Sequence, residues 1–191
     1  MSKEECRKKV HLPLDKKIVV YTGHLYEWKG ADVLARAAAL VPPYVHIYLV
    51  GGTAEDVQKF KKTYHTDNLH IVGWQLHELV PCWLEAADLL VLPNSSKEKI
   101  SAQYTSPLKL FEYMASKTPM LLAKIPSIQE VVGEHGNFFE PDNEQSLAEG
   151  IQRGLAGSDE QERMDEWVNE EIKKYSWDIR AEQIKNFIVE K

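Results

Sequence analysis

The chain of 191 residues suits one compact domain, and its 43% hydrophobic residues are enough to build a core. Its two cysteines, Cys6 and Cys82, belong to no C-x-x-C or Cys/His cluster, which argues against a disulfide scaffold or a metal site. No apolar run approaches the roughly 18 residues that span a bilayer, and the first residues carry charges of both signs. We therefore expect a cytoplasmic protein that is neither secreted nor membrane-spanning.

The formal net charge of -6 is unevenly distributed along the chain. Residues 1–133 carry 16 basic and 14 acidic residues, whereas residues 134–191 carry 7 and 15, which accounts for all 23 and 29. An anionic ligand should therefore bind to the first two thirds. The acidic remainder argues against nucleic acid as a partner, because nucleic-acid-binding surfaces are basic.

The predicted elements begin with a strand, a loop and a helix. Residues 1–15 predict a short charged helix and linker. Residues 16–23, KKIVVYTG, form a β-branched apolar run closed by a glycine, which predicts a buried strand that turns sharply. Residues 31–40 are rich in strong helix formers and end before Pro42 and Pro43, so they predict a helix.

The same alternation continues along the chain. Further strands are predicted at residues 45–52, 69–74, 88–93 and 119–123, with a short one at 137–140. Helices are predicted at residues 53–64, 76–87 and 106–116, and from Asn143 to the end. Thr53 is the expected cap of the first of these helices, and Pro81 interrupts the second.

Buried strands that alternate with helices predict an α/β fold, a Rossmann-like doubly wound parallel sheet of about six strands with helices on both faces. We assign residues 16–175 to this domain and residues 176–191 to a carboxy-terminal helix. The helices after Asn143 either pack on the sheet or reach towards a neighbouring domain. Such sheets bind ligands beyond the carboxyl ends of their strands, so candidate residues are sought in those loops.

The first candidate loop is GHLYEWKG, residues 23–30. Gly23 lets the backbone approach a ligand, the helix that follows offers free N–H groups, and Lys29 adds a full positive charge. These features suit a diphosphate. The loop matches neither G-x-G-x-x-G nor the P-loop pattern, and a glycine and a lysine also occur in such loops by chance.

The second candidate is YTSPLKLFEYMA, residues 104–115. Ser106 as the cap and Pro107 at the first helical position predict a helix start, whose free N–H groups at residues 106–108 can bind an anion or a hydroxyl. Glu112 lies more than one turn further on, and its two oxygens can accept hydrogen bonds from a vicinal diol such as ribose. The alternative is an ordinary exposed helix glutamate.

Three segments together resemble a known family. YTGHLYEWKG, GWQLHELVPCWLEAADLLVLP and SPLKLFEYMASKTPMLLAKIPSIQEVV are similar to the carboxy-terminal domain of family 4 GT-B glycosyltransferases. The resemblance runs from Lys16 to the final SWDIRAEQIKNF helix. It implies one half of a GT-B fold that binds a nucleoside diphosphate sugar, based on UDP or GDP, as the donor.

The resemblance also implies an activity and partners. Family members transfer the sugar to an acceptor hydroxyl, generally with retention of configuration and without a metal, so no cofactor is required beyond the donor substrate. The implied partners are an amino-terminal GT-B domain and an acceptor glycan, lipid or small molecule. Without the amino-terminal domain the chain is expected to be inactive, and that domain is where a peripheral membrane association would arise.

The resemblance assigns roles to single residues. Lys29 falls on the lysine that grips the donor diphosphate, whereas His24 falls where the family has an arginine. Glu112 matches the ribose-binding glutamate, and with Lys29 it is a candidate catalytic residue. Tyr104 stands eight positions earlier, near where the family has a sugar-binding glutamate, and Glu98 is a candidate substitute for that missing carboxylate.

Further contacts with the donor are implied around these residues. The backbone of Ser106, Pro107 and Leu108 faces the sugar or phosphate in this reading, and Lys109 adds charge unless it faces solvent. The region after the third strand contacts the base, which points to Val72, Gly73 and Trp74.

Two other classes of function are open at this stage. His24 and Tyr104 depart from the family pattern, which favours a non-catalytic nucleotide- or sugar-binding module or a degenerate transferase domain. A flavodoxin-like signalling domain is less favoured, because the first strand does not end in an acidic cluster.

Overall fold

The computed structural model describes residues 1–104, 108–157 and 159–189, and it contains a single parallel sheet. Its strands are β1 (Lys17–Thr22), β2 (Val45–Val50), β3 (Leu69–Gly73), β4 (Leu89–Leu92), β5 (Met120–Ala123) and β6 (Phe138–Phe139). The strand order is β3-β2-β1-β4-β5-β6, with every pairing parallel. The doubly wound sheet predicted from the sequence is confirmed, and its order reverses between β1 and β4.

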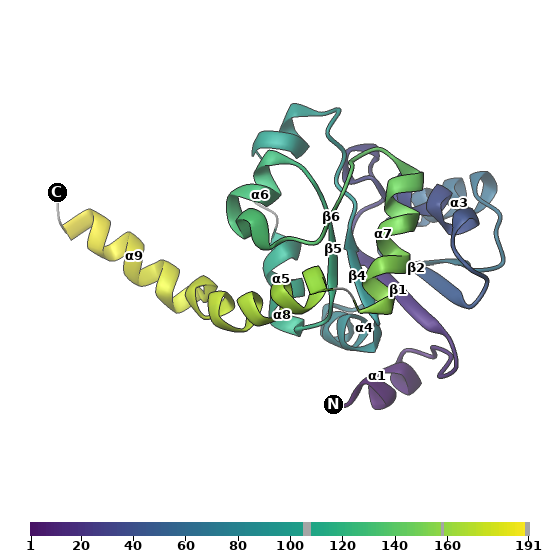
Figure 1. Ribbon diagram of the computed structural model, residues 1–191, viewed down its shortest axis with the longest axis horizontal. Helices are drawn as coiled ribbons and strands as arrows, with labels where there is room; N and C mark the ends of the chain where they lie inside the picture. Colours follow the sequence, from purple (N-terminus) through teal and green to yellow (C-terminus); the bar gives the residue numbers. More distant parts are fainter. Residues whose placement is uncertain (105–107, 158, 190–191) are drawn as a thin grey trace.

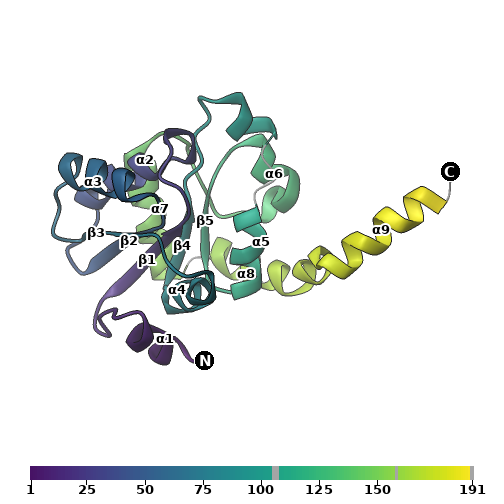
Figure 2. The ribbon, with the colours of Figure 1, turned by 180° about the vertical axis from the view of Figure 1, so that it is seen from behind.

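Helices cover both faces of the sheet (Figures 1 and 2). The α-helices of the described residues are α1 (Lys3–Lys9), α2 (Ala31–Ala37), α3 (Ala54–Thr63), α4 (Val80–Ala86), α5 (Leu108–Ser116), α6 (Pro126–Val132), α7 (Glu144–Ala156), α8 (Asp159–Glu171) and α9 (Trp177–Val189). Right-handed crossovers place α2 and α3 on one face and α4 and α5 on the other. α7 packs against α2, and α1 packs against α4.

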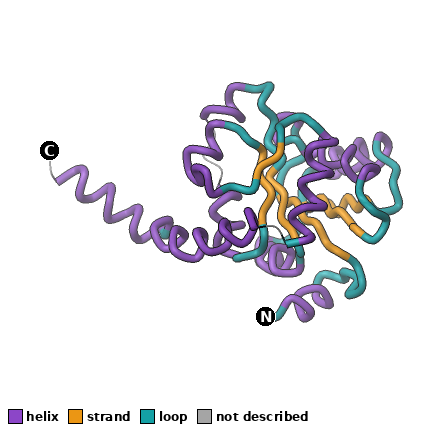
Figure 3. The backbone as a smooth tube through the Cα atoms, viewed as in Figure 1, coloured by secondary structure: helices purple, strands orange, loops and turns teal. Residues whose placement is uncertain are grey.

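The core lies between these layers, where the strands appear as the central orange elements of Figure 3. All residues of β4 and β5 are buried, and so is β1 after its first residue. Burial on both faces explains why these strands read as continuous apolar runs in the sequence. The rigid sheet therefore holds the loops at its carboxyl edge in fixed positions.

Local capping explains several element boundaries. Thr53 caps α3 through a capping box with Asp56, as its position predicted. The predicted helix over residues 76–87 is divided into a 3-10 turn at His77–Leu79 and α4, because Pro81 fits only the first turn of a helix. Pro126 likewise begins α6, which the sequence analysis did not predict.

The segment between β4 and α5 differs from the predicted loop. Residues Ile100–Tyr104 form a π-helical turn, called η4 here, within what was expected to be irregular chain. The predicted helix start at Ser106 and Pro107 lies outside the described residues, and α5 is described from Leu108.

The two ends of the chain behave differently. α1 is fixed to the domain by Arg7, whose guanidinium donates to the Ala86 carbonyl at 2.9 Å and pairs with Asp88 at 2.7 Å. α9 extends away from the body of the molecule in Figure 1 and buries none of its described residues. Among the helices in the described ranges, none is long and apolar enough to cross a membrane.

Candidate functional site

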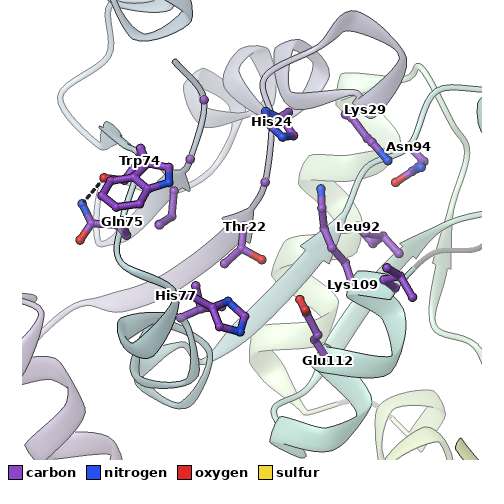
Figure 4. Close-up of a pocket in the computed structure, with 16 residues that line it drawn as sticks. Thr22, His24, Lys29, Trp74, Gln75, His77, Leu92, Asn94, Lys109 and Glu112 are labelled. Carbon is purple, nitrogen blue, oxygen red and sulfur yellow. Dashed lines mark hydrogen bonds between the residues drawn. The ribbon is translucent and has the colours of Figure 1, made fainter. Parts of the chain in front are cut away.

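A pocket of about 420 Å³ lies at the carboxyl edge of the sheet, where the strand order reverses between β1 and β4 (Figure 4). This is the position at which doubly wound sheets bind ligands. The residues that line it are Thr22, Gly23, His24, Lys29, Val50, Gly51, Gly52, Trp74, Gln75, His77, Val80, Leu92, Asn94, Leu108, Lys109 and Glu112. Both predicted loops contribute to it.

Gly23 directly follows β1 and has a φ of +140°, a conformation that side-chain-bearing residues rarely adopt. A Cβ at this position would overlap the ammonium group of Lys109. Glycine therefore allows the end of β1 and the lysine of α5 to approach each other closely. The approach of a ligand to Gly23 stays a prediction, and the near neighbour in the structure is the Lys109 side chain, which lines the pocket.

The side chain of Lys109, on α5, contacts an aromatic residue of β1. Its Nζ donates to the Tyr21 hydroxyl at 3.0 Å and lies 4.4 Å from the centre of that ring. Burial, and to a smaller extent the charge of Lys29, lower the pKa of Lys109 to about 7, against the opposing effect of Glu112. Lys109 therefore faces the pocket and not the solvent, and a bound anion would favour its charged form.

Lys29 reaches the same pocket from the other side. It ends the 3-10 turn Glu27–Lys29, and its Nζ lies 3.8 Å from the centre of the Trp28 ring. Burial lowers the pKa of Lys29. The charge of Lys29 also lowers the pKa of Lys109, so the two cations, which line the same pocket, repel each other. An anion between them would relieve that repulsion.

Glu112 lies on the face of α5 that borders the pocket, and its carboxylate points towards Lys109 in Figure 4. The helix is fixed in place by the next residue, because the buried Tyr113 hydroxyl accepts a hydrogen bond from the Thr22 backbone N–H at 2.9 Å. Burial raises the pKa of Tyr113 to about 12. Glu112 itself is exposed, so it is available to a ligand.

The two residues that depart from the family pattern lie in different places. His24 is exposed, lines the pocket and stacks on Tyr26 with ring centres 4.9 Å apart. Tyr104 ends the η4 turn with 74% of its surface exposed, and it is not among the residues that form the wall of the pocket. Glu98 borders a separate pocket of about 230 Å³. Among the described residues that line the larger pocket, Glu112 is therefore the only carboxylate.

The predicted base-binding region is only partly at the pocket. Trp74 lines it with 70% of its surface exposed, followed by Gln75 and His77. Val72 packs against the core instead, and the Gly73 carbonyl accepts a hydrogen bond from the Gly51 N–H at 2.7 Å. Neither residue is among the described residues that line the pocket. The wall begins at Trp74, two residues later than predicted, because the strand itself continues through Gly73.

Other predicted residues have a simpler outcome. Leu108 begins the described part of α5 and lines the pocket, which brings the positive end of that helix to the site. Ser106 and Pro107 lie outside the described residues. The sequence analysis overlooked Asn94, although its place directly after the fourth strand was a usable signal. In the described ranges, no group of three or more His, Cys, Asp or Glu residues has the arrangement of a metal site.

Comparison with known proteins gives a consistent result. The family model described as "Glycosyl transferases group 1" matches residues 16–156. TuaC of Bacillus subtilis strain 168, named for teichuronic acid biosynthesis, is 32% identical over 155 residues, which cover 80% of this chain and 36% of TuaC. A D-inositol 3-phosphate glycosyltransferase of Corynebacterium urealyticum is 26% identical over 95% of this chain and 45% of the relative. The chain therefore spans less than half of these relatives.

Solved structures show the same fold. The structure of HepE from Anabaena, in complex with UDP and glucose, superposes with a TM-score of 0.79 at 21% identity, over 99% of this chain and 52% of that one. The carboxy-terminal domain of LpcC, a group 1 glycosyl transferase of Francisella tularensis, superposes with a TM-score of 0.69 at 19% identity, over 91% and 92%. This chain belongs to the glycosyl transferases group 1 family and has the fold of the carboxy-terminal, Rossmann-like half of a GT-B enzyme.

Proposed function

We propose that the pocket binds a nucleoside diphosphate sugar and that the chain is the donor-binding half of a glycosyltransferase. The observation that carries this proposal is the convergence of Lys29 and Lys109 on one pocket that also contains the Glu112 carboxylate. The two cations suit a diphosphate, and the carboxylate suits the paired hydroxyls of a ribose. The UDP complexes of the HepE structures support this assignment, because HepE has the same fold.

The lysines also provide a catalytic contribution in this proposal. Negative charge develops on the diphosphate as the bond to the sugar breaks, and positive groups fixed at that position lower the barrier. Lys29 and Lys109 are held in place before the ligand arrives, by the Trp28 ring and the Tyr21 hydroxyl. The reaction itself is proposed to be a metal-independent transfer to an acceptor hydroxyl with retention of configuration, in the cytoplasm.

The acceptor side of the reaction is proposed to come from a second domain. The chain covers 36% of TuaC and 52% of the HepE chain, so the rest of a transferase of that length would lie outside these 191 residues. We therefore expect the chain alone to bind donor without transferring sugar. Efficient transfer to an acceptor by this polypeptide by itself would contradict that expectation.

A second candidate function is a nucleotide-sugar-binding module without catalysis. It is favoured by Tyr104, which stands where the resemblance implied a sugar-binding glutamate and whose exposed side chain is outside the pocket wall. The two candidates share the same binding site. They differ in whether the chain, joined to an acceptor domain of the family, supports turnover.

Isothermal titration calorimetry with UDP, UDP-glucose, GDP and GDP-mannose tests the proposed function. One nucleotide series should bind, and Lys29→Ala and Glu112→Ala should each weaken it by about tenfold or more, the value of a charge-assisted hydrogen bond. Glu130, which is exposed on α6 and outside the pocket, provides the control Glu130→Ala. Binding that survives both pocket substitutions unchanged would remove the site assignment.

For Glu112 the ligand offers a sharper comparison. If the carboxylate accepts hydrogen bonds from ribose, Glu112→Ala should weaken UDP but leave 2′,3′-dideoxy-UDP unaffected, because that analogue has no hydroxyls to donate. An equal effect on both ligands would place Glu112 away from the ribose.

A further inference from the structure

Asn94, the second residue after β4, is a buried residue whose side-chain oxygen has no hydrogen-bond partner among the described residues. The residue is 3% exposed, and it lines the pocket. Among the residues that the structure describes, none donates a hydrogen bond to its Oδ1, although this atom is shielded from solvent. An unpaired buried carbonyl lowers stability, so its presence in a pocket wall indicates a group that is paired when a ligand is bound.

The direction of the Asn94 amide follows from its neighbour Ser101. The Ser101 hydroxyl donates its one hydrogen to the Trp28 carbonyl at 3.0 Å, so towards Asn94 it can only accept. The Asn94 Nδ2 lies 3.4 Å from that hydroxyl oxygen and donates to it. Turning the amide over would require the Ser101 hydroxyl to give up its hydrogen bond to the Trp28 carbonyl. The Oδ1 atom is therefore the one left unpaired at the pocket.

The surroundings of Asn94 are fixed. Gly30, with a φ of +70°, lies so close to Pro93 that a Cβ would overlap the Pro93 carbonyl. The Ser95 N–H donates to the Trp28 carbonyl at 3.1 Å, which ties the end of β4 to the turn that carries Lys29. In Figure 4, Lys29 and Asn94 point towards each other from these two segments. A group bound by Lys29 would thus lie beside the Asn94 oxygen.

The chemistry of the unpaired atom limits what it can bind. A carbonyl oxygen only accepts hydrogen bonds, and an ionised diphosphate also only accepts, so phosphate oxygens cannot pair with it. Lys29 has donors, but its Nζ is placed over the Trp28 ring. A hydroxyl or N–H group of the ligand next to the diphosphate can donate to this oxygen.

We infer that Asn94 is a specificity-determining residue, whose side-chain oxygen accepts a hydrogen bond from a hydroxyl of the sugar attached to the diphosphate. This inference rests on the proposed function and extends it. Asn94 would favour the intact donor over the nucleoside diphosphate that remains after transfer. It would do so without a carboxylate at the position of Tyr104.

The test compares two ligands on the same variant. For the wild type and Asn94→Ala, calorimetry with UDP and UDP-glucose, or with GDP and GDP-mannose if guanosine is the base, gives the ratio of the two affinities. We expect Asn94→Ala to weaken the sugar-bearing ligand about tenfold and to leave the nucleoside diphosphate within about twofold, as for one lost hydrogen bond to a buried acceptor. Retained nucleotide binding also shows that the variant is folded.

Two further variants make the comparison specific. Asn68 is a buried asparagine whose Nδ2 donates to the carbonyls of Ala38 and Val45, away from the pocket, so Asn68→Ala should lower the melting temperature without changing the affinity ratio. Ser101→Ala releases the Asn94 amide and should shift the ratio in the same direction as Asn94→Ala. It serves as the readout if Asn94→Ala does not fold.

Each outcome bears on the inference. Equal weakening of both ligands by Asn94→Ala would mean that Asn94 acts on the part that the two ligands share. Unchanged affinity for both ligands would mean that Asn94 does not contact the sugar. Either result overturns the inference while the proposed function stands. A wild-type chain that binds neither ligand would overturn both.

Discussion

The Tyr21 hydroxyl, at the end of β1, accepts a hydrogen bond from the Lys109 ammonium of α5 at 3.0 Å and donates one to the His24 carbonyl at 2.7 Å. Tyr21 is completely buried, so a single phenol joins the first candidate loop to the second. This contact fixes a cation of α5 over the loop after β1. It is the link that makes one pocket out of two distant segments of sequence.

The first prediction concerns the two lysines. Lys29→Met and Lys109→Met should each weaken UDP-glucose binding by about tenfold to a hundredfold, because each removes a charge-assisted hydrogen bond to the diphosphate. Lys61→Met is the matched control, because Lys61 is exposed on α3 and outside the pocket. Calorimetry measures all three, and an equal loss in the control would show a general effect of net charge.

The second prediction is a pH dependence of binding. The pKa of Lys109 is about 7, and a bound diphosphate raises it by favouring the charged form. Binding therefore takes up a proton above about pH 7, and affinity for UDP-glucose falls by up to about tenfold per pH unit as the pH rises towards 8.5. Below pH 7 this contribution is fully present.

Lys109→Met separates this effect from other titrating groups. The comparison with the wild-type profile assigns the decline to one residue of the pocket. In the variant, the decline in affinity between about pH 7 and pH 8.5 should be absent. The heat of binding should also be the same in two buffers that differ in ionisation enthalpy, because binding then takes up no proton. A decline that persists in the variant would assign it to another residue.

A third prediction is that Lys109→Met raises the stability of the domain, measured without added ligand. Its pKa in the folded state is lower than the unfolded value of 10.5, so the unfolded state binds more protons between these two pH values. The destabilising effect is complete below about pH 7 and fades as the pH approaches 10.5. At pH 7 the variant should melt higher, by about 2–4 °C for each kcal/mol gained. A lower melting temperature would mean that the Tyr21 contact outweighs the burial of charge.

The fourth prediction concerns the anchor of α5. Tyr113→Phe leaves the Thr22 backbone N–H without its 2.9 Å partner inside the core, which should lower the free energy of unfolding by about 1–3 kcal/mol. Tyr44→Phe, at an exposed tyrosine, is the matched control. Urea denaturation measures both, and equal stability of the two variants would show that the Thr22 contact contributes nothing.

Much of this arrangement was predictable from the sequence. Parallel strands buried on both faces give continuous apolar runs, so β1 to β5 were found, and Thr53 gave the start of α3. Lys29, Lys109 and Glu112 could be assigned to one site because the carboxyl ends of the strands share an edge.

Other features depend on contacts between distant segments. Tyr104 is the last residue of the π-helical turn η4 and is exposed, and the sequence has no simple signal for such a turn. The unpaired oxygen of Asn94 is defined only once Ser101 and Trp28 are placed beside it. Pro126, by contrast, was a usable signal for α6.

The most direct test of the central claim is a crystal structure of the chain with UDP bound. We predict that the diphosphate lies between Lys29 and Lys109, with phosphate oxygens about 2.7–3.2 Å from both ammonium groups, and that the ribose hydroxyls donate to Glu112. A nucleotide bound elsewhere on the chain, or in this pocket with its diphosphate away from both lysines, would contradict the proposed function.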